Sequence, residues 1–99
     1  MRLKASEIES ILHAFSELLA DKDRVLKLYG SRVNDSLKGG DIDLVLICKD
    51  LSSLPPKHIV LASLKKTLGD RKIDLSFITH EKAKDPFWVE ALKCAIELP

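Results

Sequence analysis

Two aspartates separated by one residue, Asp41 and Asp43, open an apolar segment near the middle of this 99-residue chain. Side chains alternate across a strand, so both carboxylates face the same side, with Cα atoms about 6.6 Å apart. Carboxylate oxygens are the ligands that Mg²⁺ prefers. A third aspartate, Asp74, opens a later apolar segment. If that segment reaches the same sheet edge, the three aspartates form one metal site.

Three clustered carboxylates repel one another unless a cation lies among them. Each pair at about 4 Å costs about 1 kcal/mol in water and about 4 kcal/mol at the effective dielectric of a protein surface. A bound divalent ion reverses this sign. We therefore predict that Asp41, Asp43 and Asp74 are catalytic residues and ligands of Mg²⁺, with two ions in the site. Asp74 would act at the attacking hydroxyl and help to accept its proton.

A glycine–serine turn precedes the aspartates and has the features of a phosphate-binding site. Gly30 lets the backbone approach a phosphate without a Cβ in the way. The Ser31 hydroxyl and the amides of a following helical turn can donate to phosphate oxygens. Arg32 and Lys38 would add positive charge, although each also fits a solvated surface charge. Gly30, Ser31 and Arg32 are the predicted nucleotide-binding residues.

Apolar periodicity predicts helices and strands that alternate along the chain. A first helix is predicted from an apolar stripe that runs from Ile8 to Leu19. Ser6 and Glu9 fit a capping box at its start, and the polar cluster Asp21-Lys22-Asp23 ends it. The later predicted elements are a strand at 25–29, a helical turn at 31–36, a strand at 41–48, a helix from Pro55-Pro56 to Gly69, a strand at 72–78 and a helix from Pro86 to Ile96.

This order predicts a single α/β domain over residues 1–99 (α+β by some schemes), with a small mixed three-stranded sheet flanked by helices. The turn and the aspartates meet only if the first two strands are antiparallel neighbours and the third runs parallel to the second. The helix between the second and third strands is long enough for a parallel crossover. Apolar residues on both faces of the 41–48 strand predict that it is central and covered on both sides.

Composition excludes several classes of protein. Hydrophobic residues make up 45% and charged residues 31% of the chain, which is typical of a globular domain. A net charge of +1 argues against direct nucleic-acid or membrane binding. We see no signal peptide and no bilayer-spanning run, so we expect a cytoplasmic protein with Cys48 and Cys94 buried and reduced. A domain this small leaves apolar surface for a partner or a second subunit.

The ordered motifs resemble the minimal nucleotidyltransferases of the DNA polymerase β-like nucleotidyltransferase superfamily. The superfamily pattern of Gly-Ser, Asp-x-Asp and a later Asp reads here as Gly30-Ser31, Asp41-Ile42-Asp43 and Asp74. The resemblance covers the chain from the first helix to the third strand. It implies the nucleotidyltransferase fold, ATP as substrate and Mg²⁺ as cofactor. It also implies an antitoxin that transfers AMP to a tyrosine of a HEPN-domain ribonuclease toxin.

Two alternatives remain open because fold-level kinship does not choose the acceptor. Family members often carry a more basic turn after Gly-Ser, whereas Asp35 adds negative charge here. This departure bears on catalytic strength. The small size of the chain and its apolar last helix favour a catalytically weak or inactive antitoxin that acts by binding, with Phe87, Val89 and Leu98 either facing the partner or completing the domain's own core. The other alternative is a small-molecule nucleotidyltransferase working as an oligomer. We expect no second domain to grip a small substrate, which favours a protein acceptor.

Overall fold

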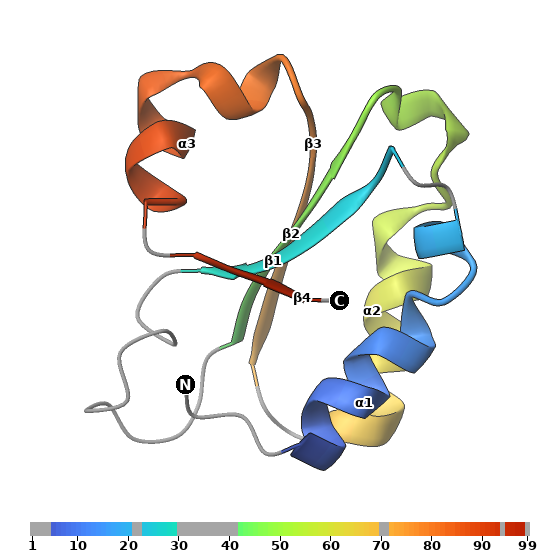
Figure 1. Cartoon of the computed structure of the whole chain (residues 1–99). Helices are drawn as coiled ribbons and strands as arrows, with labels where there is room; N and C mark the ends of the chain where they lie inside the picture. The colour runs from blue at the N-terminus through green and yellow to red at the C-terminus, as the bar shows by residue number, and fades with distance from the viewer. Residues whose placement is uncertain (1–4, 21–22, 30–41, 70–71, 94, 99) are drawn as a thin grey trace.

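The computed structural model describes residues 5–20, 23–29, 42–69, 72–93 and 95–98. Over these ranges the chain forms a small α+β fold with three α-helices and a four-stranded mixed sheet (Figure 1). Its elements are α1 (Ala5–Ala14), η1 (Leu18–Ala20), β1 (Val25–Tyr29), β2 (Ile42–Cys48), η3 (Leu51–Ser53), α2 (Lys57–Leu68), β3 (Ile73–Thr79), η4 (Lys82–Lys84), α3 (Pro86–Ala91) and β4 (Ile96–Leu98).

The sheet has the strand order β3-β2-β1-β4. β1 pairs antiparallel with both β2 and β4, whereas β2 pairs parallel with β3. The helix α2 lies in the connection between the two parallel strands. The predicted arrangement, antiparallel between the first two strands and parallel between the second and third, is therefore confirmed.

Helices cover both faces of the sheet, with α1 and α2 on one side and α3 on the other (Figure 1). Ile42, Leu44 and Leu46 of β2 lie in the core against α1 and α2. Val45 and Ile47 point the other way, into a smaller cluster that includes Trp88 of α3. The prediction of a central strand buried on both faces is confirmed, because its alternating side chains supply both cores.

The predicted helix from Pro86 to Ile96 is wrong in its second half. The helix α3 ends at Ala91, and Ile96–Leu98 forms the edge strand β4 on β1, so the sheet has four strands instead of the predicted three. Leu98 lies opposite Leu26 and is only 5% exposed, because the pairing turns it into the main core. The alternative hypothesis placed Leu98 on a surface that faces a partner, and this placement is wrong because the side chain is buried.

The first helix is shorter than predicted. It ends at Ala14, where the backbone tightens: the Ser16 amide donates to the His13 carbonyl at 3.2 Å, a bond between residues three apart. This turn places Phe15 fully in the core and leaves Leu18 in η1. Ser6 lies inside α1 and not at its cap, so the predicted capping box is not formed.

Two further expectations concern membranes and cysteines. Among the helices of the described ranges, none has the length and hydropathy needed to cross a bilayer. Cys48 is a free, buried thiol, as predicted, and burial raises its pKa. Cys94 lies outside the described residues.

Gly69 ends α2 in a backbone conformation that other residues rarely adopt. Its φ is +74° and its ψ is −141°, while its amide donates to the Lys65 carbonyl at 3.0 Å. An added Cβ would meet nothing within 4 Å, so the cost of a side chain comes from the backbone alone. We expect Gly69→Ala to lower the free energy of unfolding by about 1–3 kcal/mol in urea titrations.

The matched control is Ser63→Ala on the exposed face of the same helix, which we expect to change stability by less than about 0.5 kcal/mol. If Gly69→Ala were as stable as the unmodified chain, the expected backbone strain of a residue other than glycine at this position would be contradicted.

Candidate active site

Two carboxylates meet at one end of the sheet. Asp43 and Asp74 are the second residues of the parallel neighbours β2 and β3, and their Cα atoms are paired in register. Neighbouring strands lie about 4.8 Å apart, so the two side chains start from adjacent positions. Asp43 is half-buried and Asp74 is exposed. Both lie on the face opposite α1 and α2, because Ile42 beside Asp43 packs against those helices.

Tyr29 extends this pair into a row across three strands. It is the last residue of β1 and is the antiparallel partner of Asp43. Its half-buried ring packs edge-on against Trp88 of α3, with centroids 5.4 Å apart and planes at 66°. The row Tyr29–Asp43–Asp74, here called the carboxylate row, therefore borders the small core under α3.

The surroundings of the Tyr29 phenol shift its pKa. Burial raises the pKa of Tyr29, a hydrogen bond with the Ser76 side chain works in the opposite direction, and the charges of Asp43 and Asp74 raise the pKa further. Ser76 belongs to β3, on the far side of β2, two residues after Asp74 on the same face. The charges of both carboxylates in the row therefore act on the Tyr29 hydroxyl.

Ionisation of Tyr29 gives a direct measure of this electrostatic environment, because the chain contains one tyrosine. In a titration followed by tyrosinate absorbance, we expect a midpoint above the ordinary pKa of 10.0. Asp74→Asn should lower that midpoint, since it removes a negative charge that opposes the phenolate. Over the same pH range the folded state holds the Tyr29 proton more tightly than the unfolded state does. The free energy of unfolding should therefore fall as pH rises from the unfolded-state pKa of Tyr29 through its folded-state pKa.

Glu97→Gln is the control for this titration, because Glu97 lies on the same face of the sheet but on β4, outside the carboxylate row. It should move the midpoint less than Asp74→Asn does. An Asp74→Asn midpoint equal to or above that of the unmodified chain would contradict the described placement of the phenol.

Four of the predicted site residues, Gly30, Ser31, Arg32 and Asp41, lie outside the described residues, as does Lys38. In the chain, Gly30 follows Tyr29 and Asp41 precedes Ile42, the first residue of β2. The described strands thus bring Tyr29 and Ile42, the chain neighbours of Gly30 and Asp41, to the same end of the sheet. Their roles remain predictions.

The donor chemistry of the row suits Mg²⁺. This ion takes oxygen ligands and is commonly bound by one or two carboxylates together with substrate phosphates. Asp43 and Asp74 supply two carboxylates from adjacent positions. Within the described ranges, no group of three His, Cys, Asp or Glu side chains converges as metal ligands do. The predicted third ligand, Asp41, lies outside those ranges.

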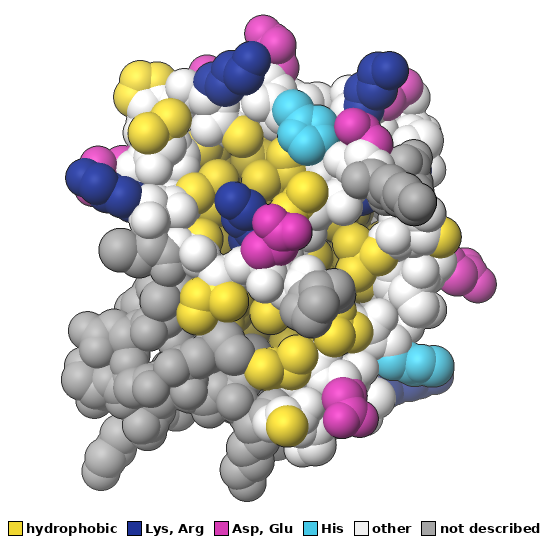
Figure 2. Space-filling view, in the orientation of Figure 1, with side chains coloured by type: hydrophobic (Ala, Val, Ile, Leu, Met, Phe, Trp, Pro, Cys, Tyr) yellow, Lys and Arg dark blue, Asp and Glu magenta, His cyan; other side chains and the backbone are white. Residues whose placement is uncertain are grey.

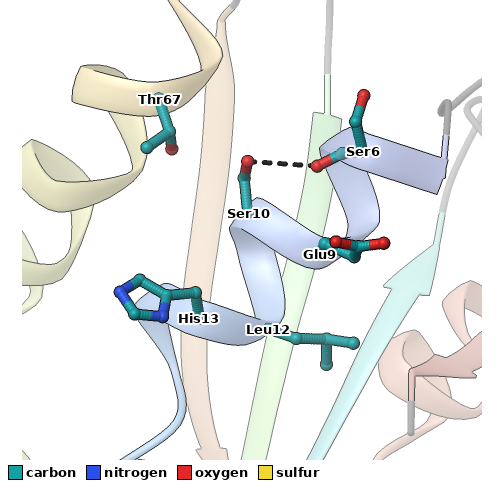
Figure 3. A pocket seen from close by; sticks show the side chains of 6 residues that line it. All are labelled: Ser6, Glu9, Ser10, Leu12, His13 and Thr67. Carbon is teal, nitrogen blue, oxygen red and sulfur yellow. Dashed lines mark hydrogen bonds between the residues drawn. The ribbon is translucent and has the colours of Figure 1, made fainter.

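Other polar hollows lie away from this row. A shallow depression of about 750 Å³ is lined by residues of α1 and by Thr67 of α2, and within it the Ser10 hydroxyl donates to the Ser6 carbonyl at 3.1 Å (Figure 3). It belongs to the helices on the opposite face of the sheet. Six residues line it: Ser6, Glu9, Ser10, Leu12, His13 and Thr67.

A polar cluster lies at the end of the sheet opposite to the carboxylate row. Arg24, just before β1, donates to the Leu18 carbonyl at 3.1 Å and to the Ser53 hydroxyl at 2.9 Å. The His80 ring donates to the Asp23 carbonyl at 2.8 Å. These bonds join the segments around the ends of β1, β2 and β3, which is a structural role.

The placement of Tyr29 and Ser76 beside the aspartates was not predicted from the sequence. Ser76 could have been found by alternation, because it shares a face with Asp74 two residues earlier. Tyr29 could not, since its neighbours depend on the register between β1 and β2.

Comparison with protein-family models and with curated proteins gives no match for this chain. The functional argument therefore depends on its own residues and on the motifs they form.

Proposed function

We propose that this chain is a Mg²⁺-dependent nucleotidyltransferase that moves AMP from ATP to a hydroxyl of a partner protein in the cytoplasm. The observation that carries the proposal is the register pairing of Asp43 with Asp74 at the starts of two parallel strands, beside the end of β1. Adjacent carboxylates at this position support a shared metal-binding role better than two isolated surface charges do.

In the proposed reaction, the acceptor oxygen forms a bond to the α-phosphorus of ATP while the bond to the β-phosphate oxygen breaks and pyrophosphate leaves. Asp41, Asp43 and Asp74 would hold Mg²⁺, and Asp74 would also help to take the acceptor proton. Mg²⁺, when bound, supplies charge neutralisation of the triphosphate and activation of the hydroxyl. Gly30, Ser31 and Arg32 would hold the phosphates through backbone amides, a hydroxyl and a guanidinium.

Exposed apolar side chains near the row support a protein as the acceptor. Figure 2 shows hydrophobic side chains at the surface in its upper left, the region that α3 occupies in Figure 1. Two residues of α3 are strongly exposed: Phe87 at 68% and Val89 at 56%. The Phe87 ring contacts Trp88 at 5.2 Å between centroids, and Trp88 contacts Tyr29 of the carboxylate row. The motif resemblance suggests a tyrosine of a HEPN-domain ribonuclease as the acceptor, with this chain as its antitoxin.

The experiment uses ATP labelled at the α-phosphate, Mg²⁺ and, as the acceptor that the motif resemblance suggests, a HEPN-domain ribonuclease. We expect label on the ribonuclease, loss of its activity, and no transfer when the metal is chelated. Full labelling by the Asp43→Asn/Asp74→Asn double variant would show that the proposed site is wrong.

A second function, inhibition by binding alone, is favoured by the exposed Phe87 and Val89 of α3. Under this alternative, the double variant Asp43→Asn/Asp74→Asn still neutralises the ribonuclease, whereas Phe87→Asp does not. Under the transferase proposal, the double variant loses neutralisation. Mixing each variant with the ribonuclease and measuring RNA cleavage separates the two functions.

A further inference from the structure

We propose that Tyr29 is an intramolecular acceptor, so that the chain transfers AMP to its own phenol when no partner hydroxyl occupies the site. The inference rests on the proposed nucleotidyltransferase function and adds a modification site within the chain itself. It would make the antitoxin activity depend on whether the partner or Tyr29 receives the adenylyl group.

The position of the phenol is the first support. Tyr29 pairs with Asp43, which in turn pairs with Asp74, so one hydroxyl side chain belongs to the same row as both carboxylates. Burial, the Ser76 side chain of β3 and the charges of Asp43 and Asp74 all act on the pKa of Tyr29, which agrees with a phenol near this part of the sheet. A hydroxyl in the same row as the carboxylate that would receive its proton is a candidate acceptor.

The packing of the ring is the second support. Trp88 is 8% exposed and holds the Tyr29 ring from the α3 side, while Tyr29 itself remains partly accessible. An acceptor fixed beside the reacting groups has a large entropic advantage over one that must diffuse in. Tyr29 would thus compete with a partner hydroxyl without needing any binding surface.

The step is balanced without a further reactant. The Tyr29 oxygen bonds to the α-phosphorus of ATP, the bond from that phosphorus to the β-phosphate oxygen breaks, and pyrophosphate leaves. The phenolic proton passes to the carboxylate of Asp74 and then to water. The product carries a bulky nucleotide on the carboxylate row, which would hinder entry of a second ATP and of the partner.

The test incubates the full chain with ATP and Mg²⁺ in the absence of any partner, followed by intact mass measurement and peptide mapping. We expect the mass of one adenylyl group on the peptide containing Tyr29. Tyr29→Phe keeps the ring that packs on Trp88 and should lose the modification completely. Glu97→Gln, on the same face but outside the row, should be modified like the unmodified chain.

The outcomes separate this inference from the function on which it rests. Labelling of the ribonuclease with no modification of Tyr29 would overturn the inference and leave the transferase function standing. Modification of any residue other than Tyr29, or equal modification of Tyr29→Phe, would also overturn it. Absence of labelling on both the ribonuclease and the chain would overturn both.

Discussion

Replacing Asp43 or Asp74 by asparagine is expected to lower the rate of AMP transfer about a hundredfold to a thousandfold. One preorganised electrostatic group in an active site contributes about 3–4 kcal/mol to transition-state stabilisation, which corresponds to that change in rate. Each substitution removes a negative ligand from the carboxylate row while leaving a side chain of the same shape. The loss should therefore appear in transfer of α-labelled phosphate at saturating ATP and Mg²⁺.

The fold should survive both changes, because Asp43 is half-buried and Asp74 is exposed at the start of its strand. Circular dichroism and urea titrations should confirm this. The matched control is Glu97→Gln, a change of the same kind on the same face of the sheet, which should keep the unmodified rate. If Asp43→Asn and Asp74→Asn both transferred AMP within tenfold of the unmodified rate, the carboxylate row could not be the catalytic centre.

Leu44→Ala is expected to lower the free energy of unfolding by about 2–5 kcal/mol. Leu44 is fully buried in β2, opposite Leu28 of β1 and Leu75 of β3, within the core under α1 and α2. Truncation removes buried methyl groups and leaves a cavity that flanking strands cannot easily fill. Because small domains are stable by only about 5–15 kcal/mol, the urea midpoint should fall sharply.

Ile59→Ala is the control for the core prediction. Ile59 is an aliphatic residue of α2 but is 55% exposed, so we expect a loss below about 0.5 kcal/mol. A loss for Ile59→Ala as large as that for Leu44→Ala would mean that the core is not centred on β2.

The central part of the fold was predictable because its pattern is unambiguous. The apolar side chains from Ile42 to Ile47 lie on both faces of the strand, and those of each face pack into a core. A shift of the strand by one residue would exchange the two faces, so the register is well determined. The need to bring Asp43 and Asp74 to one sheet edge then predicted the strand directions. The register pairing of these two aspartates agrees with that prediction.

The C-terminal part was not predictable in the same way. The apolar spacing from Trp88 to Ile96 fits a helix, and a three-residue strand is too short to show its own period. What decides the structure is pairing with β1, which turns Leu98 into the core and adds backbone hydrogen bonds. Such a contact joins segments that are far apart in the chain, and local patterns do not report it.

The site was predictable in its carboxylates but not in its full surroundings. Asp43 and Asp74 follow from strand alternation and direction. The phenol of Tyr29 and the hydroxyl of Ser76 join them only through the register of three strands and the packing of Trp88. The parts assigned to Gly30, Ser31, Arg32 and Asp41 remain predictions, because those residues lie outside the described ranges.

The most direct test of the central proposal follows two labels of ATP in parallel reactions with the ribonuclease partner and Mg²⁺. Transfer of AMP predicts that label from the α-phosphate appears on the partner while label from the γ-phosphate leaves as pyrophosphate. It also predicts that the Asp43→Asn/Asp74→Asn double variant transfers neither label. Undiminished α-label transfer by that variant, or γ-label on the partner of the unmodified chain, would contradict a nucleotidyltransferase site at the carboxylate row.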